Sequence, residues 1–469
     1  MRKWLLWIVV IFIIISMITK INGDNKSFHK KNINPSKYID VSKYLVGVLD
    51  TTFGGVGYVV YDGVAGRNAW DYGNSIYVDK EGKIYVTGSS SRSGSNTDMV
   101  IWRYNSNGSL DTSFNGTGIV VHNNAAGGNG NDIGASIYVD KGGKIYVTGH
   151  SWDGSNYDMV IWRYNNNGSL DKAFGSGGIV VNAKGSGGNS IYVDKYEKIY
   201  VTGYRRNGSN EDMAIWRYNS DGSLDKTFGS GGMVSHNNAA GGNGDDVGRS
   251  IFVDNNGKIY VTGWSWNGNN RDMVIWRYDG DGSLDTTFGG IGYVVSNYAA
   301  GSDLNNSGGS AADDIGASIY VDKEGKIYVT GSSNRNGSNT DMVIWRYNSN
   351  GSLDTSFNVT GIVDHHNAAG GDGWDGGNSI YVDKYGKIYV TGYSEKSNRN
   401  KDMVIWKYNS DGSLDTAFGG VGYVVHGNAA KGNLDDEGKS IYVDSTGRVY
   451  VTGYSWNDSN TDMVIWKYK

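Results

Sequence analysis

The sequence predicts an all-β fold, namely a seven-bladed β-propeller with four-stranded blades. A unit of about 60 residues recurs, and its Ile-(Tyr/Phe)-Val-Asp segment starts at Ile76, Ile137, Ile191, Ile251, Ile319, Ile380 and Ile441. The last unit stops at Lys469, before the Leu-Asp-x-x-Phe segment that ends each earlier unit, and that segment stands instead at residues 49–53. A closed ring joins its first unit to its last, whereas a linear array ends in capping units. The displaced segment therefore predicts a ring.

Each unit contains four short segments with the composition of β-strands. In the first unit they are residues 75–79, 83–87, 99–104 and 118–121, which are rich in β-branched and aromatic residues. Clusters of Gly, Asn and Asp bound them, as expected for strands joined by turns. Four strands in each of seven units describe a propeller.

The N-terminal part of the ring is expected to complete its last blade. Residues 57–60 would form the outermost strand of blade 7 and pair with residues 463–468, which removes a free sheet edge. The composition of 72 Gly, 1 Pro and 13% aromatic residues suits a chain made of strands and turns. We therefore assign residues 49–469 to one propeller domain.

The first 23 residues have the character of an export segment. Arg2 and Lys3 precede an apolar stretch that begins at Trp4, an order typical of export signals. The stretch is shorter than the span of about 20 residues that a membrane helix needs. No good cleavage site follows, so a cleaved signal peptide and an N-terminal membrane anchor both stay open. Residues 24–48 are polar and are expected to be a linker. An extracellular or cell-surface protein is predicted.

The repeats also resemble a known family. Residues 218–232, Tyr-Asn-Ser-Asp-Gly-Ser-Leu-Asp-Lys-Thr-Phe-Gly-Ser-Gly-Gly, lie between Asp-Met-Ala-Ile-Trp-Arg (212–217) and Gly-Lys-Ile-Tyr-Val-Thr-Gly (257–263). These motifs resemble the bacterial delta-60 repeat, and the resemblance covers residues 49–469. The Val-Asp-x-x-Gly-x-Ile-Tyr-Val-Thr-Gly portion is similar to the related short bacterial β-propeller repeats. Both families imply exported propellers without a set of catalytic residues. The Ile-Tyr-Val-Asp segment departs from the delta-60 pattern, in which small and apolar residues are commoner, and implies a differently lined channel.

Two recurring residues have a structural interpretation. A Trp on the third strand is expected to fill the space between blades. These residues are Trp102, Trp162, Trp216, Trp276, Trp345, Trp406 and Trp466. The Asp that ends the first strand, Asp79 in the first unit, precedes a tight turn and is expected to form an Asx-type turn.

Another Asp recurs four residues before the strand Ser. It occurs as Asp71, Asp132, Asp246, Asp314, Asp375 and Asp436. These positions lead into the innermost strands and are expected to form a polar ring at one mouth of the central channel. Six carboxylates there could gather a cation or a polar ligand. In the alternative, which we favour, each carboxylate accepts backbone N–H bonds and stitches one blade to the next.

Two patterns that suggest metal binding are better explained as structural. The Asn/Asp-x-Asn/Asp-Gly-Ser-Leu-Asp runs lack the ligand series and terminal Glu of an EF-hand. Histidines end the outer strands of several units, at His122, His236, His365 and His426. They belong to different blades and lie too far apart to share a zinc ion. No metal site and no cofactor is predicted.

The loops between the second and third strands differ among the blades. Blades 1 and 5 carry Ser, Arg and Asn there, whereas other blades carry aromatic residues. The candidate ligand-binding residues are Trp152, Tyr204, Trp264, Trp266, Tyr393 and Trp456. Exposed aromatic rings among short polar residues suit sugar rings. In the alternative, these rings fold down over the ends of the blades.

These features predict an exported, non-catalytic binding or adhesion module for a polysaccharide or a cell-surface component. Catalysis needs unlike residues in separate roles, and near-equivalent repeats offer mostly like ones, so no enzyme and no catalytic residues are predicted. Two alternatives stay open: a propeller enzyme, such as a polysaccharide lyase or glycosidase, and a protein-binding scaffold. A net charge of −5 without a basic block excludes nucleic acid as a partner. A monomer is expected.

Overall fold

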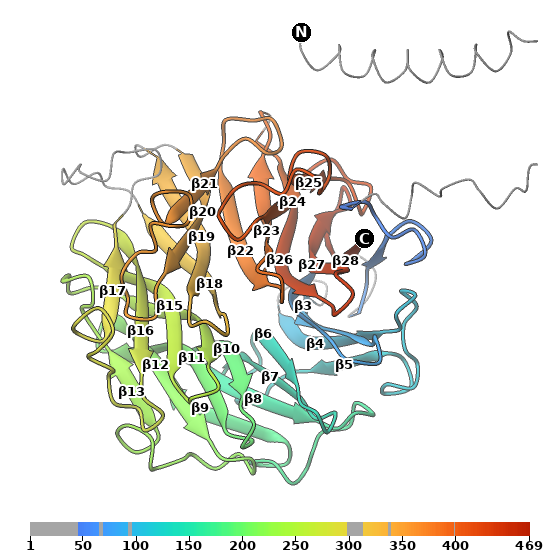
Figure 1. Cartoon of the computed structure of the whole chain (residues 1–469). Helices are drawn as coiled ribbons and strands as arrows, with labels where there is room; N and C mark the ends of the chain where they lie inside the picture. Colours follow the sequence, from blue (N-terminus) through green and yellow to red (C-terminus); the bar gives the residue numbers. More distant parts are fainter. Residues whose placement is uncertain (1–45, 65–68, 92–95, 298–312, 336–338, 398) are drawn as a thin grey trace, which may run out of the picture. The chain divides into compact units, whose positions relative to one another are not determined.

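Seven four-stranded antiparallel sheets surround a central channel in the computed structural model (Figure 1). The structure describes residues 46–64, 69–91, 96–297, 313–335, 339–397 and 399–469. The predicted seven-bladed propeller is confirmed. The predicted export segment and most of the predicted linker lie outside the described residues. Within those residues there is no helix long and apolar enough to span a membrane.

Each blade runs outward from the channel as four consecutive strands. The innermost strands are β2 (Asp71–Val78), β6 (Asp132–Val139), β10 (Ser186–Val193), β14 (Asp246–Val253), β18 (Asp314–Val321), β22 (Asp375–Val382) and β26 (Asp436–Val443). The second strands are β3 (Ile84–Ser91), β7 (Ile145–Trp152), β11 (Ile199–Asn207), β15 (Ile259–Trp266), β19 (Ile327–Arg335), β23 (Ile388–Glu395) and β27 (Val449–Trp456). The third strands are β4 (Thr97–Tyr104), β8 (Tyr157–Tyr164), β12 (Asn210–Tyr218), β16 (Arg271–Tyr278), β20 (Asn339–Tyr347), β24 (Lys401–Tyr408) and β28 (Thr461–Tyr468). The outermost strands are β5 (Ile119–His122), β9 (Ile179–Lys184), β13 (Met233–His236), β17 (Tyr293–Ser296), β21 (Ile362–His365), β25 (Tyr423–His426) and β1 (Tyr58–Tyr61).

The strand β1 closes the ring as the sequence predicts. It pairs antiparallel with β28, with Tyr58 opposite Trp466 and Tyr61 opposite Met463. Blade 7 thus takes its outer strand from the other end of the propeller sequence, and the pairing covers the edge of β28.

The innermost strands begin earlier than predicted. In blade 1 the strand starts at Asp71 rather than at residue 75, and its register shifts between Gly73 and Ser75. The same irregularity occurs in every inner strand at the equivalent Gly and Ser. Polar residues and a bulge interrupt the alternation of apolar side chains that a strand prediction depends on, so the sequence signal is lost there.

Apolar side chains fill the space between neighbouring blades. One cluster joins Met99 and Ile101 of blade 1 to Val147 and Trp162 of blade 2, and equivalent clusters lie between the other blades. The seven recurring Trp side chains are almost completely buried. Their predicted place between blades is confirmed.

Two circular arrangements tie the inner strands together. The first consists of hydrogen bonds from an Ile N–H to a Ser Oγ of the preceding blade, such as Ile137 to Ser75 (3.2 Å) and Ile76 to Ser440 (3.3 Å). The other blades repeat this bond. The second is a closed ring of aromatic side chains from the Ile-Tyr-Val-Asp segments, with neighbouring centroids 5.6 to 6.0 Å apart. The Ile-Tyr-Val-Asp segments thus line the channel with aromatic rings.

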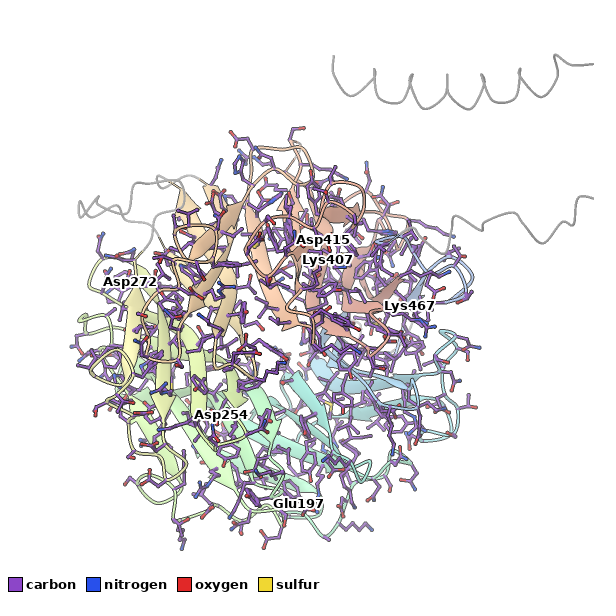
Figure 2. The ribbon with its side chains drawn as sticks, viewed as in Figure 1. Glu197, Asp254, Asp272, Lys407, Asp415 and Lys467 are labelled. Atoms are coloured by element: carbon purple, nitrogen blue, oxygen red, sulfur yellow. The ribbon has the colours of Figure 1, made fainter. Side chains whose placement is uncertain are left out.

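On the face that carries the first-to-second-strand turns, carboxylates hold the loops. Asp79 Oδ1 accepts hydrogen bonds from Glu81 N and Lys83 N, both 2.9 Å, which confirms the predicted Asx turn. The Asp of each Leu-Asp-x-x-Phe segment pairs with the basic residue after the core Trp. In blade 6, Asp415 and Lys407 lie side by side, with 3.4 Å between Oδ2 and Nζ (Figure 2).

Candidate functional site

The loops between blades lie on the same face as the loops between second and third strands. In blade 2, Gly128 N donates to Trp152 O and Trp152 N donates to Asn131 O, which joins the two kinds of loop. We call this the connection face. There the central channel opens into a cavity of about 360 Å³ that receives residues from all seven blades. The lining includes Asn74, Ala135, Asn189, Arg249, Ala317, Asn378 and Lys439, together with Tyr393.

Seven of these lining residues occupy one equivalent position, just before the strand Ser at the bulge. Where the residue is Asn, it is structural: Asn74 Nδ2 donates to Gly134 O of the next blade (2.9 Å), and Asn189 donates to Gly248 O (2.8 Å). Blades 2 and 5 carry Ala, which leaves space at the mouth. Only Arg249 and Lys439 place a charge at this position.

Arg249 provides an unbalanced positive charge. Among the described residues, its guanidinium makes no hydrogen bond and no ion pair. The side chain contacts solvent inside the channel, yet the protein surrounds it. This burial lowers the pKa of Arg249, and Arg271 lowers it further, while Glu211 and Tyr204 oppose the shift. Arg249 stays charged at neutral pH, because an arginine pKa lies far above 7.

Lys439 is held by a buried carboxylate. Its Nζ lies 2.7 Å from Glu437 Oε1, which also accepts a hydrogen bond from Asn378 Nδ2 at 2.8 Å. Tyr454 OH donates to Glu437 Oε2 at 2.7 Å. Burial would raise the pKa of Glu437, but Lys439, Lys401 and the Tyr454 hydrogen bond outweigh it and lower the pKa. Glu437 is therefore ionised and balances Lys439, so the net charge of this pair is close to zero.

A row of four aromatic side chains runs from the rim of the connection face to this pair. Trp70 lies 5.8 Å from Trp456 and 6.5 Å from Tyr72 between centroids, and Tyr72 lies 5.2 Å from Tyr454. Trp70 is 44% exposed. We call Trp70, Tyr72, Tyr454 and Trp456 the aromatic row. Trp70 and Tyr72 were missed because they precede the first predicted strand, although Tyr72 stands where other units carry Ile, Val, Gly or Glu.

Two of the predicted ligand-binding aromatics lie at the channel mouth, and one of them lines the cavity. Tyr393 packs against Gly376 with Lys401 Nζ 4.0 Å from its ring centroid, and it lines the cavity. Tyr204 packs in the equivalent way against Gly187. Both rings are partly exposed. They approach the inner strand closely because each faces a Gly, where a side chain would collide with the ring.

The remaining predicted aromatics lie elsewhere. The rings of Trp152 and Trp266 lie against Gly130 and Gly244 of the connecting loops, as in the folded-down alternative. Trp264 is buried, with the Arg271 guanidinium 4.5 Å from its ring centroid. Trp456 belongs to the aromatic row. The structure therefore does not gather the six predicted residues into one surface.

The six recurring aspartates do not line the open mouth, because they are buried. Five of them accept backbone hydrogen bonds from the connecting loops, such as Asn124 N to Asp132 Oδ2 (2.8 Å) and Gly63 N to Asp71 Oδ2 (2.9 Å). Asp314 hydrogen-bonds with the Ser333 side chain. The whole set is at most 1% exposed: Asp71, Asp132, Asp246, Asp314, Asp375 and Asp436. Burial raises the pKa of Asp71 to about 6 and that of Asp375 to about 7. The backbone hydrogen bonds hold the loops that lead into blades 1, 2, 4, 6 and 7.

Unlike residues from neighbouring blades meet on the other side of the mouth. The phenol of Tyr204 interacts electrostatically with Glu211 and Arg249. Burial raises the pKa of Glu211. His150 lies against Tyr157, with centroids 4.9 Å apart, and burial lowers its pKa to about 4, so its imidazole is neutral at pH 7. Arg249 and Glu211 therefore bring a cation and a carboxyl group from neighbouring blades together, whereas the contact of His150 with Tyr157 lies within blade 2.

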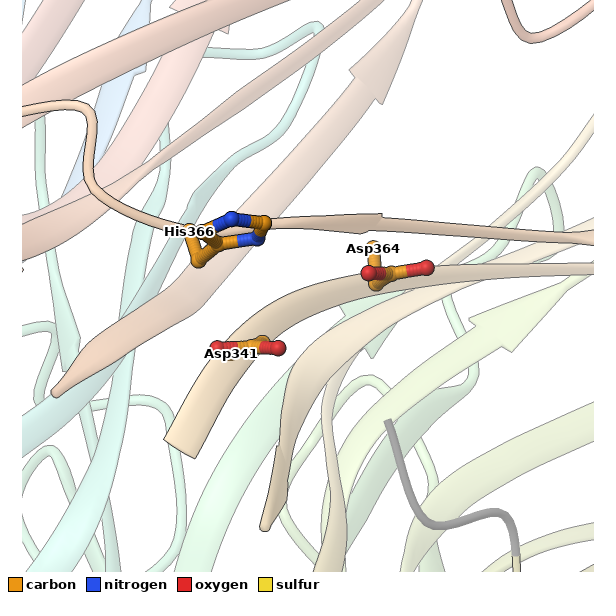
Figure 3. A group of neighbouring side chains, drawn as sticks. All are labelled: Asp341, Asp364 and His366. Carbon is orange, nitrogen blue, oxygen red and sulfur yellow. The ribbon is translucent and has the colours of Figure 1, made fainter. Parts of the chain in front are cut away.

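One group of side chains could hold a metal ion, although no metal site is predicted from the sequence. Asp341, Asp364 and His366 of blade 5 bring ligand atoms within 4.8 Å of one another (Figure 3). The four histidines considered in the sequence do not contribute. His122 shares a 3.2 Å hydrogen bond with Tyr164 of the next blade, and the equivalent contact recurs at His236 and His365.

Comparison with known families supports a short-repeat β-propeller. A model described as a beta-propeller domain of unknown function (DUF5122) matches residues 81–114, 143–174, 198–228, 255–288, 324–357 and 386–418. A second model, described as a beta-propeller repeat, matches residues 58–93, 308–337 and 427–459. Neither description names the delta-60 repeat. No curated protein matches the chain.

Several solved structures have a similar fold. The polysaccharide lyase Uly1 is 11% identical, with a TM-score of 0.48 over 87% of this chain and 92% of that one. An ulvan lyase bound to a GlcA(1-4)Rha3S saccharide is 13% identical, with a TM-score of 0.46 over 85% of this chain and 94% of that one. Chaetomium thermophilum Sqt1, bound to the N-terminus of ribosomal protein L10, is 11% identical, with a TM-score of 0.45 over 87% and 98%. At these identities the likeness concerns the fold alone.

The prediction that the chain is not an enzyme is contradicted, since solved propellers of similar fold include polysaccharide lyases and the fold itself is therefore compatible with an enzyme. The prediction relied on the near-equivalence of the repeats. At the channel mouth that premise fails, since equivalent positions carry Asn, Ala, Arg and Lys in different blades. Unlike side chains therefore meet at the axis even though the framework repeats.

Proposed function

We propose that the protein acts on an anionic polysaccharide at its connection face, with a carboxylate or sulfate of the sugar chain paired to Arg249. The observation that carries the proposal is the unbalanced Arg249 charge inside a cavity lined by all seven blades. A charge-assisted hydrogen bond would stabilise a guanidinium in this setting more than a neutral one. The planar arrangement of its N–H donors matches the oxygens of a carboxylate or sulfate. The net charge of the chain is −5, so the positive charge of Arg249 at the channel mouth does not reflect an excess of basic residues in the whole chain.

The aromatic row supports a sugar polymer rather than a small anion. Its four rings lead from exposed Trp70 to Tyr454, whose hydroxyl bonds Glu437 beside the mouth. Aromatic faces bind the apolar side of sugar rings, and adjacent carboxylate and amide groups bind hydroxyls. A polymer that packs on this row would extend into the cavity and place its charged groups near Arg249. A small free anion would make no use of the aromatic row.

Paired probes that differ only in charge test the proposal. Polygalacturonate and its fully methyl-esterified form present the same backbone with and without carboxylates. We expect the full chain to bind the first and not the second in affinity gel electrophoresis. Arg249→Asn introduces the residue that blades 1, 3 and 6 carry at this position. It should weaken binding about 10- to 100-fold, the range for losing a charged hydrogen bond.

Trp70→Ala is the second arm of this experiment. It should weaken binding of polygalacturonate through lost ring contact while leaving the preference for the charged form unchanged. Asn189→Ala, which imitates blades 2 and 5, serves as a matched control at the mouth. Equal binding of both probes, or undiminished binding by Arg249→Asn, would contradict the anionic part of the proposal.

A second candidate function is cleavage of the bound polysaccharide by β-elimination. The observation that favours it is the electrostatic interaction of Arg249 with Glu211 of the neighbouring blade, where burial raises the pKa of Glu211. In such a reaction a base removes the proton beside the uronate carboxylate, and a C=C bond forms as the neighbouring C–O bond breaks. The departing sugar oxygen keeps the electron pair of that bond and takes up a proton from water. A cation on the carboxylate stabilises the charge that develops. A carboxylate with a raised pKa, such as Glu211, suits the base.

Ultraviolet absorbance of the unsaturated product measures this activity directly. Incubation of the full chain with polygalacturonate should raise the absorbance, and Glu211→Gln should reduce the rate if Glu211 is the base. New reducing ends without absorbance would identify hydrolysis instead. Binding without either signal would leave recognition as the function.

We also infer that the repeats are of the delta-60 type and that the chain is exported. The first inference rests on the ordered motifs within residues 212–232 and 257–263, and the second on Arg2, Lys3 and the apolar stretch after them. Fractionation of cells that express the full chain tests export. Recovery in the cytoplasm alone would refute it.

A further inference from the structure

Blades 1 and 5 provide a natural comparison because their sequences are nearly the same. Residues 96–128 of blade 1 and 339–371 of blade 5 differ at three positions: Gly116 and Val359, Val121 and Asp364, and Asn123 and His366. Two of these differences therefore place an acidic residue and an imidazole side by side on one outer strand.

Both new side chains face the same buried carboxylate. Residues two apart in an extended strand point to the same side, so Asp364 and His366 share a face at the end of β21. The pairing of β20 with β21 sets Met342 opposite His365, which brings Asp341 next to them. The ligand atoms of the three residues lie within 4.8 Å of one another, and they converge between the two strands (Figure 3). Asp341 is 1% exposed.

The added carboxylate is unfavourable by itself. A buried Asp beside a second Asp experiences like-charge repulsion in a medium of low dielectric constant. Blades 1, 2, 4, 6 and 7 avoid this cost, because Val stands at the position of Asp364. The fold therefore does not need an acidic residue there, and a cation would offset the repulsion.

The equivalent Asp in other blades is satisfied in a simpler way. Asp402 of blade 6 pairs with Lys396 at 2.7 Å, and Asp212 of blade 3 accepts a hydrogen bond from Asn207 at 2.9 Å. Lys396 belongs to the loop between the second and third strands, and Asn207 is the last residue of the second strand. In blade 5 the Asp also has two further candidate ligands, Asp364 and His366, at the end of its outer strand.

We propose that Asp341, Asp364 and His366 form a site for one divalent transition-metal ion of the Zn²⁺ class. One imidazole nitrogen and two carboxylate oxygens are ligands that Zn²⁺ accepts at about 2.0 to 2.2 Å, with a fourth position left for water. Donor atoms within 4.8 Å of one another need only small rotations to meet such an ion. The bound ion links β21 to β20 at the outer edge of blade 5. This site is separate from the channel mouth and does not depend on the proposed function.

Titration calorimetry on the full chain, after dialysis against a chelator, tests the site. We expect one equivalent of Zn²⁺ to bind, Mn²⁺ to bind more weakly, and Ca²⁺ and Mg²⁺ to bind least, because imidazole is a poor ligand for the last two ions. Asp364→Val and His366→Asn restore the blade 1 residues and should each weaken Zn²⁺ binding more than tenfold. Both variants should fold, since blade 1 folds with these residues.

A transfer of the site gives the matched control. Val121→Asp combined with Asn123→His places the blade 5 residues beside Asp98 of blade 1. That variant should bind two equivalents of Zn²⁺, one in each blade. Loss of the first equivalent when His366→Asn is added would assign it to blade 5.

Several outcomes would overturn the proposal. Absence of a stoichiometric Zn²⁺ equivalent, or an equivalent that survives both Asp364→Val and His366→Asn, would show that these residues do not hold the ion. Preference for Ca²⁺ over Zn²⁺ would contradict the assigned class of ion.

Discussion

Blade 1 and blade 5 have the same framework but different outer edges. Trp102 and Trp345 are both completely buried between blades, and the Arg that follows each Trp pairs with the Asp of its own Leu-Asp-x-x-Phe segment at 3.0 and 2.9 Å. Val121 and Asn123, by contrast, become Asp364 and His366 at the edge of blade 5. The residues that build a blade are therefore held constant, and positions at its periphery are free to acquire chemistry.

The largest effect should come from the shared core and should be the same in both blades. Trp102→Ala and Trp345→Ala each leave a cavity between blades and should cost about 3 to 5 kcal/mol of unfolding free energy. Urea denaturation of the two variants measures this cost. Clearly unequal losses would mean that the two blades do not share one packing scheme.

The next largest effect concerns the ion pairs between the Asp of each Leu-Asp-x-x-Phe segment and the Arg that follows the core Trp. Burial would raise the pKa of Asp354, but Lys326 and Arg346 outweigh it and lower the pKa to about 2. Asp111 of blade 1 has the same surroundings and a pKa of about 2. Asp354→Asn and Asp111→Asn should each cost about 2 to 4 kcal/mol at pH 7, because Arg346 or Arg103 loses its buried partner.

The acid dependence of these two variants follows from the sign of the shift. A folded-state pKa below the unfolded value stabilises the fold above about pH 4, and this contribution is lost as the pH falls toward 2. The difference in unfolding free energy between each variant and the parent should therefore decrease as the pH falls from about 4 to about 2. A difference that stays constant from pH 7 to pH 3 would exclude the ion pair as its cause.

The connecting loop after blade 5 should show the opposite pH dependence. Burial raises the pKa of Asp375 to about 7, although hydrogen bonds from Ser394 and Asn367 N oppose the shift. A folded-state pKa above the unfolded value means that stability falls as the pH rises from about 4 through 7. Asp375→Asn removes this penalty and should gain about 1 to 3 kcal/mol relative to the parent between pH 5 and pH 8, at about 1.4 kcal/mol for each pKa unit.

Asp132, which enters blade 2 after the corresponding loop of blade 1, is the comparison for this prediction. Burial raises its pKa as well. Asp132→Asn should therefore change stability with pH in the same direction. Denaturation midpoints of the parent and both variants at pH 5 and pH 8 provide the measurement. An Asn variant whose stability relative to the parent is lower at pH 8 than at pH 5 would refute the raised pKa.

Most of the framework was predictable from the sequence because it repeats. The displaced residues 49–53 indicated closure, and the recurring Trp and Asp positions indicated the core and the Asx turns. The candidate site was less predictable, since its key residues are single departures from the repeat. Arg249 and Lys439 occupy a position where the other blades carry Asn or Ala. The repeat pattern of the sequence does not indicate that this position faces the channel. The bulge before the strand Ser decides it, and only the structure shows the bulge.

The six aromatic residues predicted to bind ligand do not form one surface, for a related reason. Trp152 and Trp266 occur in loops without any regular alternation, so the sequence did not show which way their rings point. Gly130 and Gly244 leave room for the rings to lie down on the connecting loops. His366 was overlooked because it follows the recurring His365 and has no counterpart in other blades. Comparison of blades 1 and 5, residue by residue, would have found it.

The smallest expected effect comes from the third difference between blades 1 and 5. Val359 has a φ of +65°, and Gly116 in blade 1 has a φ of +76°. A β-branched residue is unfavourable in this left-handed region, whereas Gly enters it freely. Val359 is 86% exposed, so its replacement by Gly loses little burial, and no atom lies within 4 Å of the Cβ position at Gly116. Val359→Gly should therefore stabilise the protein by about 1 kcal/mol, and Gly116→Val should destabilise it by a similar amount. Zn²⁺ binding should be unaffected by either change, because both positions lie in the turn that precedes the outer strand. Urea midpoints of the two variants test the backbone argument, and a stabilising Gly116→Val would show that contacts rather than φ govern this turn.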